Sequence, residues 1–120
     1  MLVRKIEDCR EFATPCGETV REILHAERGD FSFRYSLTHT IVRTGQRSRT
    51  YRLKMSETAY ILSGKGRVYI NGESAEIAPG CAVYVPPMSR CSFENSGKED
   101  LVFLSIVDPA FRPEQSELLD

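Results

Sequence analysis

One carboxylate stands out as a candidate for chemistry in the stretch that runs from Gly45 to Gly64. Glu57 precedes an apolar segment, and Tyr51 lies six residues before it. A glutamate buried in an apolar interior has a raised pKa unless it is paired, so Glu57 is a candidate general acid or base. His39 is the second candidate catalytic residue, because a histidine near a buried carboxylate can take part in proton transfer. A purely structural hydrogen bond between Glu57 and Tyr51 or His39 is the alternative interpretation.

Cations cluster in the first half of the same stretch. Arg47 and Arg49 lie before the expected strand or at its start, where they can reach the mouth of a binding site and attract a carboxylate or phosphate. Arg52 and Lys54 alternate with Tyr51 and are expected to point to the opposite side of the strand. An ordinary solvated charged loop is the alternative.

A long strand is expected upstream, over residues 31–43, because polar and apolar residues alternate along its whole length. His39 falls on the apolar face of this strand, which is otherwise formed by Phe31, Phe33, Tyr35, Leu37 and Ile41. The other face carries Ser32, Arg34, Ser36, Thr38 and Thr40. The pattern is typical of a strand that is buried on one side.

Further short strands are expected at residues 19–25, 49–55, 58–62, 67–71, 74–77, 82–85, 90–95 and 101–107. Turn residues separate them, for example at 28–30, and Asn71-Gly72 is the strongest hairpin signal. The run LVFLSIV at 101–107 is apolar on both faces, which is typical of a central strand covered on both sides. The tail is expected to be coil or a short helix lying over the barrel. About nine to ten antiparallel strands without a long amphipathic helix predict an all-β sandwich or barrel.

Length and charge limit the classes of function. The 120 residues predict one domain, with a core barrel at about 18–107, an N-terminal strand at 1–12 and a C-terminal tail at 108–120. A net charge of -1 gives no indication of a nucleic-acid or membrane-surface partner. No apolar run approaches the ~20 residues that span a bilayer, and residues 1–12 lack a signal-peptide pattern. We therefore expect a cytoplasmic protein, in which Cys9, Cys16, Cys81 and Cys91 are reduced.

Two segments resemble the motifs of the cupin superfamily of small β-barrels. The first motif is matched in every spacing: Gly45, five residues, Tyr51, one residue, Leu53, three residues, Glu57, six residues and Gly64. The second motif is matched by Pro79, Gly80, Pro86 and Asn95, with Cys81 in place of the usual aspartate and Cys91 in place of the usual histidine. The resemblance implies a jelly-roll β-barrel. It does not imply one activity, because cupins include oxygenases, isomerases, epimerases, storage proteins and ligand sensors.

The resemblance also directs attention to the metal-ligand positions. Metal-binding cupins deliver three histidines and one glutamate to the barrel centre, whereas these positions here hold Tyr51, Leu53, Glu57 and Cys91. Leu53 cannot bind a metal, a tyrosine ligand would have to be a phenolate, and a cysteine ligand a thiolate. In a cupin the apolar face of the 31–43 strand lines the interior, so His39 is expected to converge with Tyr51, Glu57 and Cys91. A divalent metal held by these four residues is one hypothesis; a buried neutral histidine is the other.

Taken together, the residues predict a cupin barrel that binds a small polar or anionic metabolite through Tyr51, Cys91, Arg49 and Arg47. Glu57 and His39 would catalyse a simple acid/base or isomerase-type reaction without the usual three-histidine metal site. The alternatives are a metal-dependent oxygenase or isomerase that uses His39, Glu57 and Cys91, and a non-enzymatic dimeric scaffold or ligand sensor. Cys91 is a candidate nucleophile only if His39 lowers its pKa; otherwise it is a small buried side chain. We expect a homodimer, because cupins of this size commonly pair through their sheets.

Overall fold

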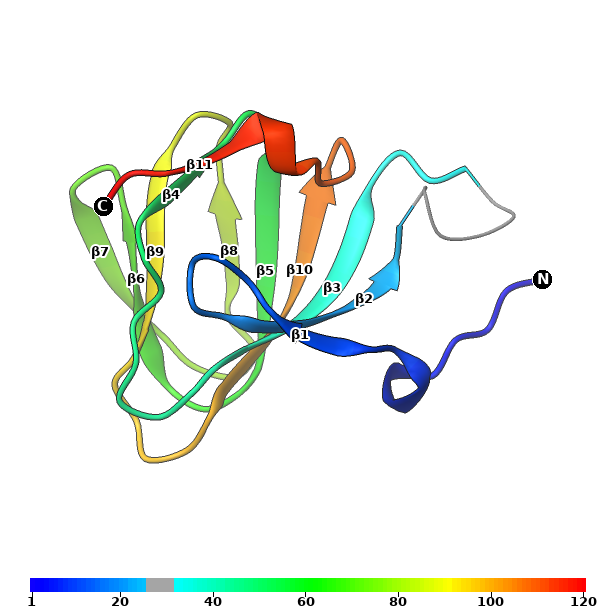
Figure 1. The fold of residues 1–120 in the computed structure, drawn as a ribbon. Coiled ribbons are helices and arrows are strands. Elements are labelled where there is room, and N and C mark those ends of the chain that lie inside the picture. Colours follow the sequence, from blue (N-terminus) through cyan, green and yellow to red (C-terminus); the bar gives the residue numbers. More distant parts are fainter. Residues whose placement is uncertain (26–31) are drawn as a thin grey trace.

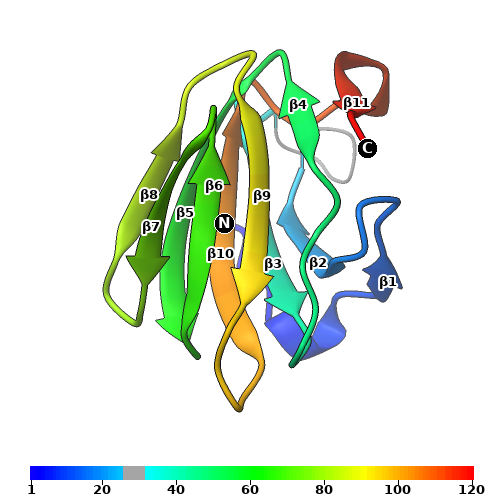
Figure 2. The same cartoon turned by 90° about the vertical axis from the view of Figure 1, so that its left-hand side faces the viewer.

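The computed structural model describes residues 1–25 and 32–120, and these form two antiparallel sheets that face each other (Figures 1 and 2). The six-stranded sheet has the order β1 (Glu11–Ala13), β2 (Thr19–Leu24), β3 (Ser36–Val42), β10 (Leu101–Asp108), β5 (Ser56–Ser63) and β8 (Ala82–Val85). The five-stranded sheet has the order β11 (Ser116–Leu118), β4 (Tyr51–Leu53), β9 (Arg90–Asn95), β6 (Gly66–Ile70) and β7 (Glu73–Ile77). The predicted all-β barrel of the jelly-roll type is confirmed.

Both ends of the chain differ from the sequence-based expectation. Instead of one strand over residues 1–12, a 3-10 helix at Ile6–Asp8 precedes the short strand β1. The tail forms a second 3-10 helix, Pro113–Gln115, and then β11, which pairs with β4 over one end of the barrel (Figure 1). The described residues therefore form eleven strands rather than nine or ten. The turn predicted at 28–30 and residue Phe31 lie outside the described residues.

The predicted hairpin at Asn71-Gly72 is confirmed. Both residues have positive φ, 50° and 86°, and they join β6 to β7 with Ile70 paired to Glu73. Asparagine and glycine are the residues that tolerate this left-handed backbone at two successive positions. Gly64 of the first motif also needs to be glycine, because a Cβ atom there would collide with the carbonyl of Asp100.

Apolar packing closes one half of the space between the sheets. Phe93 of β9 and Phe103 of β10 stack with their ring centres 4.6 Å apart, and neither side chain is exposed. Leu101 and Ile61 are also fully buried beside them in the same core cluster. This part of the barrel therefore has the dense side-chain packing of an ordinary protein core.

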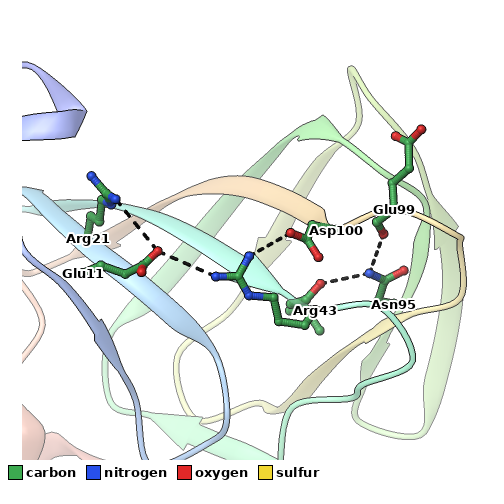
Figure 3. Close-up of polar contacts among 7 residues, drawn as sticks. Glu11, Arg21, Arg43, Asn95, Glu99 and Asp100 are labelled. Carbon is green, nitrogen blue, oxygen red and sulfur yellow. Dashed lines mark hydrogen bonds and ion pairs between the residues drawn. The ribbon is translucent and has the colours of Figure 1, made fainter.

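Polar contacts tie the strand ends together at one side of the barrel (Figure 3). Arg43 lies 2.8 Å from Asp100 and 3.8 Å from Glu11, and Glu11 lies 4.0 Å from Arg21. Asn95, the asparagine of the second motif, donates from its amide nitrogen to the carbonyls of Val42, at 2.9 Å, and Glu99, at 2.7 Å. The motif asparagine therefore has a structural role, because it fixes the β9–β10 connection to β3.

Strand β10 is central in its sheet, as predicted, but within this chain only one of its faces is fully covered. Leu101, Phe103, Ser105 and Val107 point inwards and are buried. On the outer side, the alternate residues Val102 and Leu104 are half-buried and Ile106 is 41% exposed. Within the described residues, no helix is long and apolar enough to cross a membrane.

Candidate active site

A cavity of about 580 Å³ occupies the half of the barrel that the core side chains do not fill. Strands β2, β3, β4, β5 and β10 contribute to its wall, and the loop between β1 and β2 and the C-terminal tail complete it. A volume of this size is within the range of small-molecule sites.

Glu57 is held in this cavity by two side-chain hydrogen bonds. It lies on β5 and is only 7% exposed. The hydroxyl of Tyr51, on β4, donates to Glu57 Oε1 at 2.6 Å, and the hydroxyl of Ser105, on β10, donates to Glu57 Oε2 at 2.7 Å. Three strands from both sheets therefore hold one carboxyl group in a fixed orientation.

Burial controls the protonation of this group. Loss of solvent raises the pKa of Glu57, and the hydrogen bonds from Tyr51 and Ser105 only partly oppose that rise. Burial and the neighbouring charge of Glu57 raise the pKa of Tyr51 well above its ordinary value, so the phenol keeps its proton. A fixed carboxyl with a raised pKa beside a neutral hydroxyl is an arrangement suited to proton transfer.

A second carboxyl group lines the same cavity. Glu18 directly precedes β2, is 8% exposed, and accepts a hydrogen bond from the thiol of Cys16 at 3.3 Å on Oε1. Among the described residues, no donor lies within hydrogen-bond distance of Glu18 Oε2. Burial, and then the charge of Glu57, raise the pKa of Glu18 to about 8. Two carboxyl groups that disfavour each other's ionisation therefore share one cavity.

The family is settled by comparison with known domains. The model of the cupin domain family matches residues 38–107, which run from within β3 to most of β10 and include both motifs. The chain is a cupin. An uncharacterised protein of Methanocaldococcus jannaschii is 30% identical over 114 residues, which cover 92% of this chain and 89% of that protein.

Solved structures show the same fold at lower identity. The polyketide cyclase RemF of Streptomyces resistomycificus superimposes with a TM-score of 0.83 at 18% identity, over 100% of this chain and 86% of its own. The Streptomyces protein Pac13, a nucleoside dehydratase, superimposes with a TM-score of 0.80 at 20% identity, over 99% of this chain and 91% of its own. At these identities the likeness concerns the fold alone.

The prediction that His39 points into this cupin's cavity is wrong. The alternation along β3 is as expected, but its faces are reversed: Ser36, Thr38 and Thr40 line the cavity, and His39 lies on the outer face. There it is paired in register with Arg21 and Leu104, and burial and the charge of Arg21 lower its pKa. His39 therefore has no contact with the cavity.

Cys91 is close to the site but is not part of the cavity wall. It lies directly across from Tyr51 in the β4–β9 pair, is 0% exposed, and is absent from the side chains that line the cavity. Burial, and then the charge of Glu57, raise the pKa of its thiol, so it stays protonated. These properties are typical of a small buried side chain and unfavourable for a nucleophile or a ligand contact.

Arg47 and Arg49 do not line the cavity either. The guanidinium of Arg47 lies over the ring of Tyr69, 4.0 Å from its centre, and donates to the hydroxyl of Ser92. Arg49 is hydrogen-bonded to and ion-paired with Asp120. The hypothesis that these two arginines attract an anionic ligand to the site therefore has no geometric support.

The residues at the cupin ligand positions do not fit the usual metal. Leu53 offers no donor, and the hydroxyl of Tyr51 is engaged with Glu57. Cys91 does not line the cavity, and His39 lies on the outer face of its sheet. Over residues 1–25 and 32–120, no three His, Cys, Asp or Glu side chains come together as a group that could hold a metal ion. Glu57 alone of the four positions presents a ligand suited to a divalent cation.

The sequence-based analysis missed several side chains that line the cavity. Glu18 and Cys16 come from the TPCGE segment before β2, and the histidine of the cavity is His25, whose Nε2 lies 2.9 Å from the carbonyl of Phe111. One signal was available for Ser105: it is the single polar residue in the run LVFLSIV. A lone hydroxyl in an apolar strand requires a hydrogen-bond partner, and here that partner is Glu57.

Proposed function

We propose that this cupin binds a small polar metabolite in its cavity and catalyses a simple acid/base or isomerase-type reaction, in which Glu57 moves the proton. The observation that carries the proposal is the buried Glu57 carboxyl, which Tyr51 and Ser105 fix from two other strands at 2.6 and 2.7 Å. A base held in this way loses little orientational freedom before the reaction. Because the pKa of Glu57 is raised, it lies closer to the pKa of a weakly acidic substrate proton.

Fixed hydroxyl groups give the site a second chemical capability. The neutral phenol of Tyr51 is a donor that can stabilise negative charge developing on a substrate oxygen, and its own proton is retained because its pKa is raised. The related folds of a polyketide cyclase and a nucleoside dehydratase support a small organic molecule as the ligand, since both names describe reactions on such molecules. The chemistry proposed here needs only this chain's own side chains.

The experiment is activity-based profiling of metabolites. The purified protein is incubated with a bacterial metabolite extract, and mass spectrometry follows which compounds are consumed or formed. We expect the wild type to convert at least one polar compound, and Glu57→Gln to reduce the rate by about 10²- to 10⁴-fold. Glu73→Gln is the matched control, because Glu73 is exposed on β7. If the wild type converts nothing, or Glu57→Gln is as active as the wild type, the acid/base function is refuted and the ligand-sensor alternative is favoured.

We also propose that the chain forms a homodimer through the outer face of its six-stranded sheet. Ile106 is 41% exposed there, and it lies between Leu37 and Thr58 of the neighbouring strands. Tyr60 and Tyr84 extend this apolar surface and are 48% and 60% exposed. A second copy placed on this face would cover the apolar residues on the outer side of β10.

Light scattering coupled to size-exclusion chromatography measures the assembly directly. We expect the wild type to have twice the mass of one chain and Ile106→Glu to have the mass of one, because the new charge would be buried in the interface. Glu73→Lys, which changes charge on the other sheet, is expected to leave the mass unchanged. A single-chain mass for the wild type would contradict this proposal.

A further inference from the structure

Glu18 is not explained by the Glu57–Tyr51–Ser105 arrangement. Its carboxyl is 8% exposed and lines the cavity, and only one of its oxygens has a partner, the thiol of Cys16. Within the described part of the chain, Glu18 Oε2 has no hydrogen-bond donor. A buried polar atom without a hydrogen-bond partner is unfavourable, so such an atom in a cavity is a natural contact for a ligand.

The charges around the cavity disfavour an anion. The described residues that line it include four glutamates, Glu18, Glu22, Glu57 and Glu117, and neither lysine nor arginine. A phosphate or carboxylate group entering this space would lose its hydration. Among the described lining residues it would meet four carboxyl groups and one imidazole, that of His25, whose Nε2 already lies 2.9 Å from the carbonyl of Phe111. Because its pKa is about 8, Glu18 is mostly protonated at neutral pH and can donate as well as accept a hydrogen bond.

Apart from His25 and Cys16, the remaining lining consists of hydroxyl groups and apolar surfaces. Hydroxyls come from both sheets and from the loop and tail segments, namely Thr14, Ser36, Thr38, Thr40, Ser105 and Ser116. Apolar surfaces come from Phe12, Val20, Leu53, Val107 and Phe111. Ring compounds that carry several hydroxyl groups match both kinds of surface, because their ring faces pack against apolar side chains while their hydroxyls exchange hydrogen bonds.

The geometry points to an uncharged, hydroxyl-bearing ring compound as the ligand of this cavity, with Glu18 Oε2 as the atom that contacts a ligand hydroxyl. This inference rests on the proposed function, since it names the substrate class of the same site. Glu18 then anchors the ligand from the β1–β2 loop, and Glu57 remains the group that moves the proton. Binding also gives the unpaired oxygen its missing partner.

The test compares neutral compounds with their phosphate esters on the wild-type protein by ligand-observed NMR and calorimetry. Four matched pairs serve as probes: glucose, ribose, inositol and adenosine, each with its monophosphate. We expect at least one neutral compound to bind, and its phosphate ester to bind more weakly by about tenfold or more. The inference would be overturned if any phosphate ester bound more tightly than its neutral parent. It would also be overturned if none of the neutral probes bound at millimolar concentration.

A variant then assigns the contact to Glu18. Glu18→Leu removes both side-chain oxygens at a similar volume, and we expect it to weaken binding of the neutral probe by about tenfold. Glu73→Leu, outside the cavity, is expected to bind as the wild type does. Unchanged affinity in Glu18→Leu would refute the assignment, and native circular dichroism of the variant shows that its fold is intact.

The two proposals fail in different ways. If a phosphate ester binds best while Glu57→Gln still abolishes conversion of the metabolite, the ligand class is wrong and the acid/base function stands. If neutral compounds bind through Glu18 but Glu57→Gln is as active as the wild type, the ligand class stands and the acid/base role is wrong.

Discussion

The two halves of this barrel are built on the same strands but have opposite interiors. Along β10, the inward residues Leu101 and Phe103 are fully buried in the packed core, whereas Ser105 and Val107 face the cavity. Strand β5 shows the same gradient, from Ile61 in the core to Glu57 in the cavity. The packed half has the apolar contacts that stabilise the fold. The cavity half keeps buried polar groups, whose loss of hydration destabilises the folded state. Proteins commonly give up stability in this way at functional sites.

The largest expected effect comes from the packed half. Phe103→Ala removes a ring that is 0% exposed and stacked on Phe93, so we expect it to lower the free energy of unfolding by about 3–5 kcal/mol. Urea denaturation measures the loss. Lys98→Ala, in an exposed loop, should change the stability by less than about 0.5 kcal/mol. A loss below about 1 kcal/mol for Phe103→Ala would mean that this half is not the stabilising one.

The cavity half should make stability depend on pH. Because the pKa of Glu18 is about 8 in the folded protein and near 4.5 in the unfolded chain, its stabilising contribution is complete below pH 4.5 and is lost as pH rises through 8. We expect the free energy of unfolding to fall by at most about 4 kcal/mol between pH 5 and pH 8 from this residue. Glu57 adds to the fall in the same direction, whereas Cys16 and Tyr51 stay neutral because their pKa values are raised.

Urea denaturation across this pH range, on the wild type and on Glu18→Gln, checks the second prediction. The variant has no titrating group at position 18, so its stability should decline less steeply with pH. Equal slopes for the two proteins would show that Glu18 has an ordinary pKa and that the cavity does not destabilise its charged form.

The smallest effect is the sharpest comparison of the two halves, because it uses the same residue type in each. Val42 is 1% exposed in the packed core, and Val107 borders the cavity. We expect Val42→Ala to cost about 2 kcal/mol and Val107→Ala about 1 kcal/mol, since a side chain beside an open space has fewer neighbours to lose. Thermal denaturation of both variants measures the difference. If Val107→Ala lowered the free energy of unfolding more than Val42→Ala, the cavity half would be the more tightly packed one.

Much of the fold followed from local patterns. The alternation of residues, the turn at Asn71-Gly72 and the spacing of both motifs predicted an all-β cupin barrel, and Glu57 was correctly identified as a residue of its interior. The strand β11 was not predicted, because its pairing with β4 depends on a contact between segments more than sixty residues apart. Such a pairing leaves no periodic signal in the tail itself.

The sequence alone predicts which residues share a face of each strand, because side chains alternate along any extended backbone. It did not determine which face of β3 is inside. The apolar face carrying His39 lies outside, and the face with Ser36, Thr38 and Thr40 lines the cavity. Only the tertiary structure decided this, since the choice depends on what the opposing elements present. In this cupin β2 and β10 pair with β3, and the cavity forms on the side of Ser36, Thr38 and Thr40. Both faces of an alternating strand have the same period, so the sequence of β3 carries no signal for these long-range contacts.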